Sequence, residues 1–435
     1  MQSLFYGYNF LKTWYEEHSD LNFDGLNDLS NTVECDVAIV GGGLAGLTLL
    51  EQLQRFGIDS LLIESNKIGS GASGLNGGFC SDGWALNLSK IEQVTGFQNT
   101  KRLLEIALKG LRWVEEMCAT KECVASNLKK GVITTSLSQN SQKVRERVLR
   151  SNERYQLDNK YLSRKDLEEF VTSSRYSSGI KLGEGFHFHP LNFLKGLGVR
   201  VTNMGGRIYE NTKLTHFKKV GSEFIIKVST GGKIKAKKIV LCTGGYGSSE
   251  IGALSKYWLP IETFITVTEP VDHLFAETIK KSIAISDDRR AGNYYRLLPD
   301  GRLLWGRGVS ALNGYSRQKL HQEVRKDLNY FFPQLSREIE KVKLDYTWSG
   351  KMAYSRHMMP YIGLLEPELY ALTAFGGHGM NTAPAGALLL AETIAGMNDR
   401  TYAFKQFPFS WNGGSGGKIL AELYIKYLKL SDSLS

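Results

Sequence analysis

The chain has 435 residues, which is enough for two or three domains. Apolar residues make up 42% and charged residues 23% of it, and these fractions exclude an extended disordered protein. The formal net charge is +10, but the lysines are dispersed and their densest cluster, at 233–238, falls in an expected hairpin, so we predict no nucleic-acid partner.

The five cysteines are scattered and none forms a Cys-x2-Cys pair, so we expect neither a disulfide framework nor a metal site. Cys118 and Cys123 have the spacing of a redox-active disulfide, but they follow a helical segment far from the first strand, and we do not interpret them as a redox pair. The N-terminal residues lack a secretory pattern, and no stretch reaches the ~18 apolar residues of a membrane span. We expect a cytoplasmic protein.

A βαβ unit is predicted near the start of the chain, from a strand at 37–40, a glycine-rich turn, a helix to Phe56 and a strand at 60–63. Helical patterning recurs at 99–119, 142–154 and 318–331, and strands are expected at 213–241 and 264–309. A strand at 369–374 then leads through a second glycine-rich turn at 376–379 into a helix at about 383–395. Because both ends carry a glycine turn followed by a helix, we expect the last segment to return to the first domain.

The first turn carries the spacing Gly-x-Gly-x-x-Gly between a strand and a helix. In this context the glycines permit the tight turn, the close approach of a pyrophosphate and the close packing of helix on strand. An acid at the end of the second strand can accept hydrogen bonds from a ribose. The predicted dinucleotide contacts are Gly41, Gly43, Leu44, Ala45, Gly46, Glu64 and Ser65.

The next segment, from Gly69 to Gly78, is small and hydroxyl-rich. Such a run lets a long cofactor lie close to the backbone, which favours FAD over NAD, and the alternative is a flexible loop. The sequence has no second Gly-x-Gly-x-x-Gly that would seat a nicotinamide, which disfavours the NAD(P)H reductases.

Five motifs resemble, in order and over almost the whole chain, the D-amino-acid oxidase (DAO) superfamily of FAD-dependent oxidoreductases, and within it most closely the γ-glutamylputrescine oxidase-like branch. They lie at 68–78, 241–246, 295–302, 360–363 and 375–380. Together with the predicted elements, the resemblance implies an α/β (α+β overall) fold: a Rossmann-like FAD-binding domain and a second, substrate domain with a mixed or antiparallel sheet. We expect the FAD domain at 33–95, 191–255 and 346–435 with the C-terminal helices, the substrate domain at 96–190 and 256–345, and an N-terminal extension at 1–32.

The resemblance also implies contacts between FAD and residues outside the first turn. These are Gly71, Ala72, Ser73, Asn76 and Gly77 at the flavin and phosphates, Leu214 near the adenine, Thr243 and Gly244 over the cofactor, and Gly377, His378, Gly379 and Met380 at the pyrimidine end of the flavin.

Candidate catalytic residues are His378 and Lys351. His378 either faces the flavin or the substrate, or caps the turn with its ring satisfied by the backbone. Lys351 falls where the family places residues over the flavin face, although it could equally be a surface residue at a strand edge. The candidate substrate contacts are Tyr295, Arg296, Met352 and Tyr354.

Two departures from the family pattern bear on function. Amino-acid oxidases of the family usually carry an arginine two residues after the glycine that corresponds to Gly350, and that arginine clamps the substrate carboxylate. Met352 stands there, which favours a substrate without a carboxylate beside the reacting nitrogen, unless Arg296 or Arg356 replaces the clamp. No histidine follows the Ala-Ser pair and no cysteine follows Cys242, so we expect non-covalent FAD.

The expected activity is therefore that of an FAD-dependent oxidase or dehydrogenase acting on a small amine or a γ-glutamylated amine. Flavin N5 would take hydride from the carbon that bears the neutral amine, and water would hydrolyse the resulting imine. Oxygen, a quinone or an electron-transfer protein would reoxidise the flavin. Two alternatives stay open: a D-amino-acid or N-methyl amino-acid oxidase or dehydrogenase, and a flavin-binding subunit without turnover.

Overall fold

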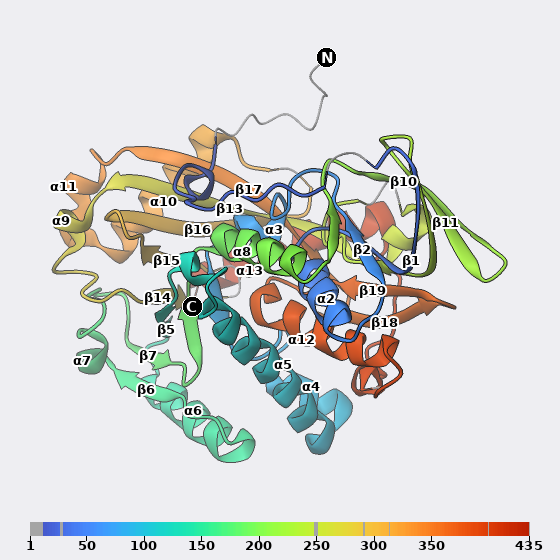
Figure 1. Cartoon of the computed structure of the whole chain (residues 1–435). Coiled ribbons are helices and arrows are strands. Elements are labelled where there is room, and N and C mark those ends of the chain that lie inside the picture. The colour runs from blue at the N-terminus through green and yellow to red at the C-terminus, as the bar shows by residue number, and fades with distance from the viewer. Residues whose placement is uncertain are drawn as a thin grey trace.

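The computed structural model describes residues 12–26, 29–247, 251–289, 292–312, 314–398 and 400–434, without the side chains of 253, 254 and 432–434. These residues form two eight-stranded sheets and one three-stranded sheet. Figure 1 shows the two large groups of strands with long helices running in front of them.

The first sheet is parallel at its centre. β1 (Thr32–Val40) pairs in parallel with β2 (Ser60–Ile63) and β12 (Lys233–Leu241), and β2 continues to β9 (Arg207–Tyr209). β12 also pairs with β19 (Leu369–Thr373), which neighbours β18 (Tyr361–Glu366), and with the hairpin of β10 (Leu214–Val220) and β11 (Glu223–Val228). The strands predicted at 37–40, 60–63, 213–241 and 369–374 are confirmed.

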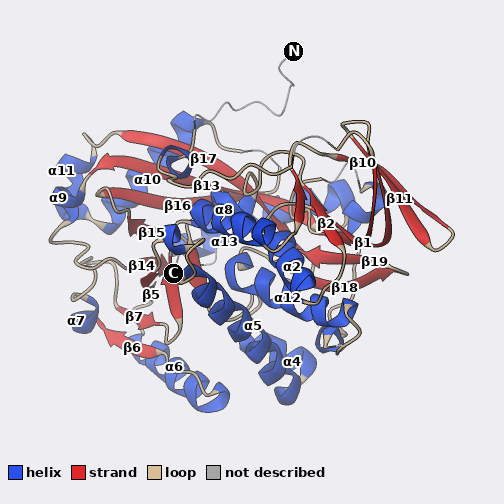
Figure 2. Cartoon of the chain, in the orientation of Figure 1, coloured by secondary structure: helices blue, strands red, loops and turns tan. Residues whose placement is uncertain are grey.

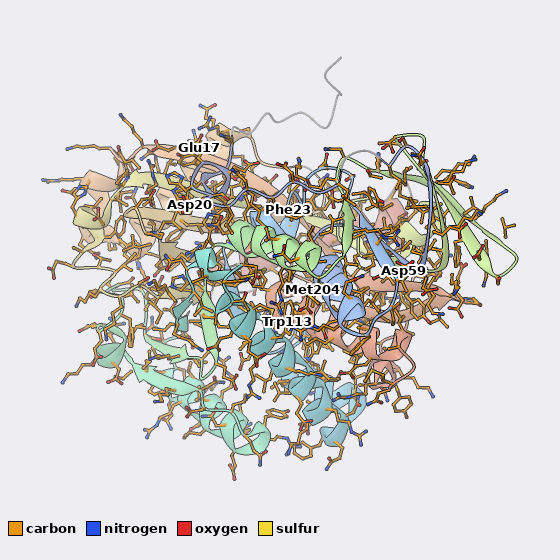
Figure 3. The ribbon with its side chains drawn as sticks, in the orientation of Figure 1. Glu17, Asp20, Phe23, Asp59, Trp113 and Met204 are labelled. Atoms are coloured by element: carbon orange, nitrogen blue, oxygen red, sulfur yellow. The ribbon has the colours of Figure 1, made fainter. Side chains whose placement is uncertain are left out.

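Apolar stripes hold the long helices on this sheet. α2 (Leu44–Arg55) packs against α8 (Pro190–Asn203) and α12 (Gly379–Ile394), and α5 (Phe97–Cys118) packs on α12 and on α4 (Leu88–Thr95). In Figure 1 the blue α2 lies beside the orange α12, so segments more than 300 residues apart meet there. Leu47, Trp113 (labelled in Figure 3) and Leu390 share one buried cluster, so α5 belongs to the core of the first sheet, although it was predicted in the second domain.

The second sheet is mainly antiparallel, and its strands are grouped at the left of Figure 2. Its order is β17 (Leu344–Tyr354), β13 (Leu259–Pro270), β16 (Arg302–Ser310), β15 (Tyr294–Leu297), β14 (Ala284–Asp287), β5 (Val132–Ser136), β7 (Ser178–Lys181) and β6 (Lys160–Ser163). The β14–β5 pair is parallel. α10 (Arg317–Phe331) buries Val324 and Leu328 in a cluster with Trp305 of β16, while α6 (Ser141–Tyr155) packs on β6 and β7.

Shorter elements complete the fold. They are α1 (Trp14–Glu17), α3 (Ala72–Leu75), β3 (Phe79–Ser81), β4 (Lys129–Lys130), α7 (Arg164–Leu167), β8 (Gly185–His187), α9 (Asp272–Phe275), α11 (Ser336–Ile339), α13 (Gly414–Leu434) and 3-10 turns at Val124–Ser126, Gly252–Tyr257, Pro333–Leu335 and Thr401–Phe404. β3, β8 and β4 form the three-stranded sheet.

The N-terminal extension is packed where the structure describes it; residues 1–11, 27 and 28 lie outside the described residues. Trp14 and Tyr15 are buried, and the Trp14 indole N–H donates to Asp300 at 2.8 Å. Phe23, labelled in Figure 3, packs on α8, where a Cβ on Gly198 would lie 3.0 Å from its ring. The extension thereby joins both halves of the molecule.

Three boundaries differ from the prediction. α12 begins at Gly379 rather than near 383, because Thr382 already bonds to the carbonyl of His378, through Oγ1 at 2.6 Å and through its N–H. β17 belongs to the second sheet, so the chain returns to the first sheet after Tyr354 rather than at 346. α13 packs beside β16 of the second sheet, whereas the C-terminal helices were expected in the FAD domain. The division into an FAD domain and a substrate domain stays our proposal, with these changed boundaries and with α5 assigned to the core of the first sheet.

All five cysteines are buried and free. Burial raises the pKa of Cys118 to about 12 and that of Cys123 to about 11, which keeps both thiols protonated and unreactive. In the described ranges, no helix is long and apolar enough to cross a membrane.

Gly110 sets the distance between α5 and α12. A Cβ there would lie 2.2 Å from the carbonyl oxygen of Asn381 and 2.6 Å from Cβ of Ala385. Gly110→Val should force the helices apart and lower the free energy of unfolding by ~1–3 kcal/mol, measured as a lower Tm. Gly416→Ala is the matched control, since a Cβ there meets nothing within 4 Å. An unchanged Tm in Gly110→Val would contradict this packing.

Candidate functional site

The turn after β1 presses the start of α2 against two strands. Gly41 has φ of 117°, and a Cβ there would lie 2.6 Å from the carbonyl oxygen of Cys242 at the end of β12. A Cβ on Gly46 would lie 2.0 Å from the carbonyl oxygen of Gly41. Neither position tolerates a side chain, as the glycine spacing predicts.

The start of α2 leaves backbone donors available. Among the described residues, no acceptor bonds to the N–H of Ala45 or Gly46, while the N–H of Leu44 donates to Oγ of Ser73 at 3.0 Å. A Cβ on Gly43 would meet only the Ser73 side chain within 4 Å. Free donors at the positive end of a helix dipole, with room in front of them, suit a pyrophosphate.

Glu64 stands beside this turn, at the end of β2. Its Oε2 accepts from the N–H of Gly42 at 2.7 Å, and its Oε1 accepts from the N–H of Asn66 at 2.9 Å and from Oγ of Ser65 at 3.0 Å. These bonds fix the carboxylate, and its remaining lone pairs can accept from ribose hydroxyls. Ser65 contacts the acid and not the turn itself.

Asn76 holds the loop after α3 in shape. Its Nδ2 donates to the carbonyls of Ala72 at 3.1 Å and Ser73 at 2.6 Å and contacts Sδ of Met380 at 3.2 Å. Its Oδ1 accepts from the N–H of Gly78 at 2.7 Å. Through Ser73 and Asn76, one loop therefore contacts the starts of both α2 and α12.

Arg296 of β15 holds the same loop from the second sheet. Its side chain is buried; Nε donates to the carbonyl of Gly77 at 2.8 Å, and Nη2 donates to the carbonyl of Phe188 at 3.0 Å and to the Tyr15 hydroxyl at 3.3 Å. No described carboxylate forms an ion pair with it. Burial, aided by the Arg296 charge, lowers the pKa of His187 to about 3, so its neutral Nδ1 accepts from Nη1 at 3.3 Å.

The second glycine turn leads from β19 into α12. Gly376 and Gly377 have φ of 60° and 86°. The helix has no side-chain cap, and the N–H groups of Gly379 and Met380 bond to no acceptor among the described residues. His378 does not cap the turn, is half-buried, and burial lowers the pKa of its imidazole. The start of α12 therefore presents a second set of free backbone N–H donors.

One face of the second sheet meets the turn and the loop. Met352 and Tyr354 share that face because side chains alternate along β17. A Cβ on Gly377 would lie 3.0 Å from the Tyr354 hydroxyl and 3.2 Å from Sδ of Met352, and a Cβ on Gly77 would lie 2.5 Å from the ring of Tyr294. We call this surface the site face; it consists of Thr263, Tyr294, Gly350, Met352 and Tyr354.

Comparison with known proteins agrees with this geometry. The sequence profile of the family described as FAD dependent oxidoreductase (DAO) matches residues 36–393. The chain belongs to this DAO family.

The relatives of this DAO protein extend over most of its length. It is 29% identical over 398 residues to the gamma-glutamylputrescine oxidoreductase of Escherichia coli (strain K12), with 90% of each chain covered. Its fold is similar to that of the L-proline dehydrogenase from P. horikoshii, with a TM-score of 0.70, 18% identity and coverage of 86% of this chain and 97% of that one. The glycine oxidase of Bacillus cereus ATCC 14579 gives a TM-score of 0.68, 18% identity and coverage of 85% and 97%.

The predicted family, fold class and cofactor are confirmed: the chain is an FAD-dependent oxidoreductase. Its described residues fit FAD. Free N–H groups lie at the starts of α2 and α12, and Oγ1 of Thr243, after β12, is buried without a partner among the described residues. We propose that the pyrophosphate lies at the start of α2, the ribose at Glu64, and the flavin between the 72–77 loop and the start of α12. Non-covalent attachment stays a prediction.

The remaining predicted cofactor contacts lie around this region. A Cβ on Gly71 would lie 3.2 Å from the ring of Tyr246, which places the segment after β12 against the loop. Gly244, in that segment, has φ of 57°. Leu214 is buried in the cluster below β1 and β2, and the N–H of Thr212 bonds to the Glu64 carbonyl at 2.7 Å, so the start of β10 lies near the ribose acid.

The structure offers none of three predicted residues to a substrate: Lys351 and Tyr295 lie off the site face, and Arg296, on the same side of β15 as Tyr294, donates to protein acceptors. Lys351 alternates to the opposite face of β17, in register with Glu262, and its backbone N–H donates to the Tyr246 hydroxyl at 2.9 Å. Tyr295 stacks on Trp305 at 4.7 Å in the core of the second sheet. The donors of Arg296 are engaged by the protein. We therefore withdraw the catalytic role of Lys351 and the substrate contacts of Tyr295 and Arg296.

Two residues of the site were not predicted. Tyr294 shares a face of β15 with Arg296, so strand alternation applied to the 295–302 motif could have found it. The Trp348 indole N–H donates to the carbonyl of Leu75 at 2.9 Å and anchors α3 on β17. No local pattern indicates that contact, since the two residues are 273 positions apart.

Replacing Gly43 and replacing Gly46 in the first turn should have different effects on FAD binding and on stability. Gly43→Val projects into the space reserved for the pyrophosphate, so FAD content should fall by about tenfold or more while the Tm of the apoprotein stays near wild type. Gly46→Val strikes the Gly41 carbonyl and should lower the apoprotein Tm. Flavin absorbance after acid precipitation measures the cofactor and tests non-covalent binding at once. Normal FAD content in Gly43→Val, or flavin retained in the precipitate, would contradict this placement.

Replacing Arg296 should loosen the 72–77 loop, which we call the flavin loop after the placement proposed above. Arg296→Met leaves the carbonyls of Gly77 and Phe188 without their donor, which should cost ~2–4 kcal/mol of stability and speed the loss of FAD on dilution. The control is Arg175→Met, because Arg175 is exposed and donates to the carbonyl of Tyr330. Its Tm and FAD retention should match wild type. Equal retention in the Arg296 variant would show that the loop does not depend on this guanidinium.

Proposed function

We propose that this DAO-family chain oxidises the C–N bond of a small amine, including γ-glutamylated amines whose carboxylate lies far from the reacting carbon. The observation that supports the proposal is the position of Met352. Its thioether stands on the site face beside the second glycine turn, where a carboxylate-binding oxidase of the family would present an arginine. A substrate with a carboxylate next to its amine finds no guanidinium there.

The rest of the site face also favours an amine. Burial raises the pKa of Tyr354 to about 12 and raises that of Tyr294, so both phenols stay neutral near pH 7. Aromatic rings and a thioether attract an amine or its cation. The five residues of the site face include no positive side chain, and the nearby guanidinium of Arg296 is engaged by protein acceptors. A carboxylate held against this face would therefore be desolvated without a partner, at a cost of roughly 1–3 kcal/mol or more.

The proposed reaction requires the protein to orient the substrate and does not require a nucleophilic side chain. Bound FAD supplies the electron acceptor. The substrate loses a hydride from the carbon that bears its neutral amine and becomes an imine, which water hydrolyses to a carbonyl compound and ammonia, or an amine where the substrate is a secondary amine. Met352 and Tyr354 hold the amine, and His378, whose imidazole burial keeps neutral, accepts at a ring nitrogen the proton that the substrate ammonium must first lose.

Anaerobic titration of the purified yellow protein tests this function. Primary and secondary amines and γ-glutamylated diamines should bleach the flavin faster than glycine, sarcosine or D-alanine. Bleaching by D-alanine or sarcosine alone would favour an amino-acid oxidase whose carboxylate clamp is Arg356, which is exposed in the turn after β17. Bleaching by none of these compounds would favour a flavin-binding subunit. Oxygen, a quinone and an electron-transfer protein can then be compared as reoxidants of the bleached enzyme.

Met352→Arg should move specificity toward amino acids. A guanidinium on the site face can bind a carboxylate in a bidentate pair, so the ratio of kcat/KM for D-alanine to that for an amine should rise by about tenfold or more. Met397→Arg is the control, because Met397 is 65% exposed after α12 and its replacement adds the same charge away from the site face. An unchanged ratio in Met352→Arg would place the substrate elsewhere.

A further inference from the structure

The C-terminal helix α13 has one face turned to the protein. Ile425 and Leu428 are buried, and the Glu422 carboxylate accepts from Oγ of Ser310 at 3.1 Å and from the N–H of Ala311 at 2.8 Å. These contacts fix the helix beside β16 and decide which side faces outward.

The outward face of α13 is apolar. Its side chains repeat at the three- and four-residue spacing of one helical face and are between 51% and 68% exposed: Ile419, Leu420, Leu423, Tyr424 and Tyr427. Trp411, just before the helix, is 65% exposed, and Leu312, next to the Ala311 that bonds Glu422, is 48% exposed. A contiguous exposed patch of large apolar side chains marks an interaction surface. We call this set of seven residues the α13 patch.

Basic residues of α13 share the helix stripe of Glu422 and border the α13 patch on that side. Lys418 and Lys426 are exposed on the helix itself. The carbonyl of Lys256 accepts from the N–H of Asn412 at the start of the helix, and Lys319 and Lys429 both lie over the ring of Tyr315, at 5.3 and 5.2 Å. The acid among the described side chains of α13, Glu422, is turned inward. The rim is therefore positive, in a chain of net charge +10.

Charge and size distinguish the partners that could cover this patch. A two-fold dimer through α13 would bring one basic rim against its copy, and a stable protein interface uses about 20–30 residues a side, far more than this patch provides. An apolar helix face with tyrosine and tryptophan among its residues and lysine at its border is typical of helices that lie in the surface of an anionic bilayer.

We propose that α13 docks the protein on an anionic membrane surface, with the α13 patch inserted among the lipid headgroups and acyl chains and the lysine rim on the phosphates. The helix lies in the plane of the bilayer and does not span it. The proposal does not depend on the substrate of the enzyme, because the patch contains no residue of the site face.

Vesicle sedimentation with the full-length, flavin-loaded protein tests the docking. The wild type should pellet with vesicles of equal parts phosphatidylcholine and phosphatidylglycerol, and less with phosphatidylcholine alone or at high salt. Leu420→Glu combined with Leu423→Glu should weaken binding by at least about tenfold, since two charges replace inserted side chains. Lys426→Glu should weaken binding to the anionic vesicles.

The matched control combines Leu149→Glu with Leu364→Glu, which charges two leucines that are 57% and 56% exposed elsewhere on the protein. It should bind as the wild type does. All variants should keep the wild-type flavin absorbance and Tm, which shows that they fold. Failure of the wild type to pellet with either vesicle, equal pelleting of the α13 double variant, or a dimer that the double variant dissociates in the absence of vesicle binding would each overturn the proposal.

Discussion

The centre of this molecule depends on a buried positive charge, the Arg296 guanidinium, which has no negative partner among the described residues. The Arg296 guanidinium bonds to the backbone of the flavin loop, to the segment before α8 and to the hydroxyl of Tyr15. Burying an unpaired cation is costly, and the cost is met by carbonyl, phenol and neutral imidazole acceptors arranged around it. Burial and the Arg296 charge keep His187 and His189 neutral, with pKa values of about 3, so neither ring repels the guanidinium. Removing any one acceptor leaves the cation less well solvated by the protein.

The loop that Arg296 holds, residues 72–77, is bonded to elements of both large sheets. The first sheet contributes helix starts with free N–H groups, and the second sheet contributes a face of aromatic and thioether side chains. Asn76 and Ser73 tie the loop to α12 and α2, while Trp348 and Arg296 tie it to the second sheet. In the placement that we propose, hydrogen bonds to this single short segment would set the positions of cofactor and substrate relative to each other. This arrangement preorganises the site without a rigid covalent link.

The sequence predicted the parts of the fold that local patterns encode. The βαβ unit, the helices at 97–118 and 317–331 and both glycine turns follow from periodicity and from the conformations that only glycine adopts freely. Contacts between distant segments were not predictable in this way. Tyr295 and Arg296 were assigned together although they point to opposite faces of one strand, and Lys351 was assigned without its register against Glu262. The helix expected from about 383 begins at Gly379 instead, and the structure carries Pro384 inside it.

The packing of the N-terminal segment has a consequence for biosynthesis. Tyr15 and Arg296 form a hydrogen bond although they are 281 residues apart in the sequence, and Trp14 and Asp300 do so at a separation of 286. At translation rates of about 5–20 residues per second, these two aromatic side chains leave the ribosome roughly 15–55 seconds before their partners exist. Until then they are exposed apolar groups of the kind that chaperones bind, and the flavin loop has no guanidinium to hold it. We therefore expect FAD capture to be a late event on the nascent chain, and we expect contacts of long sequence separation, rather than the early βαβ unit, to limit the folding rate.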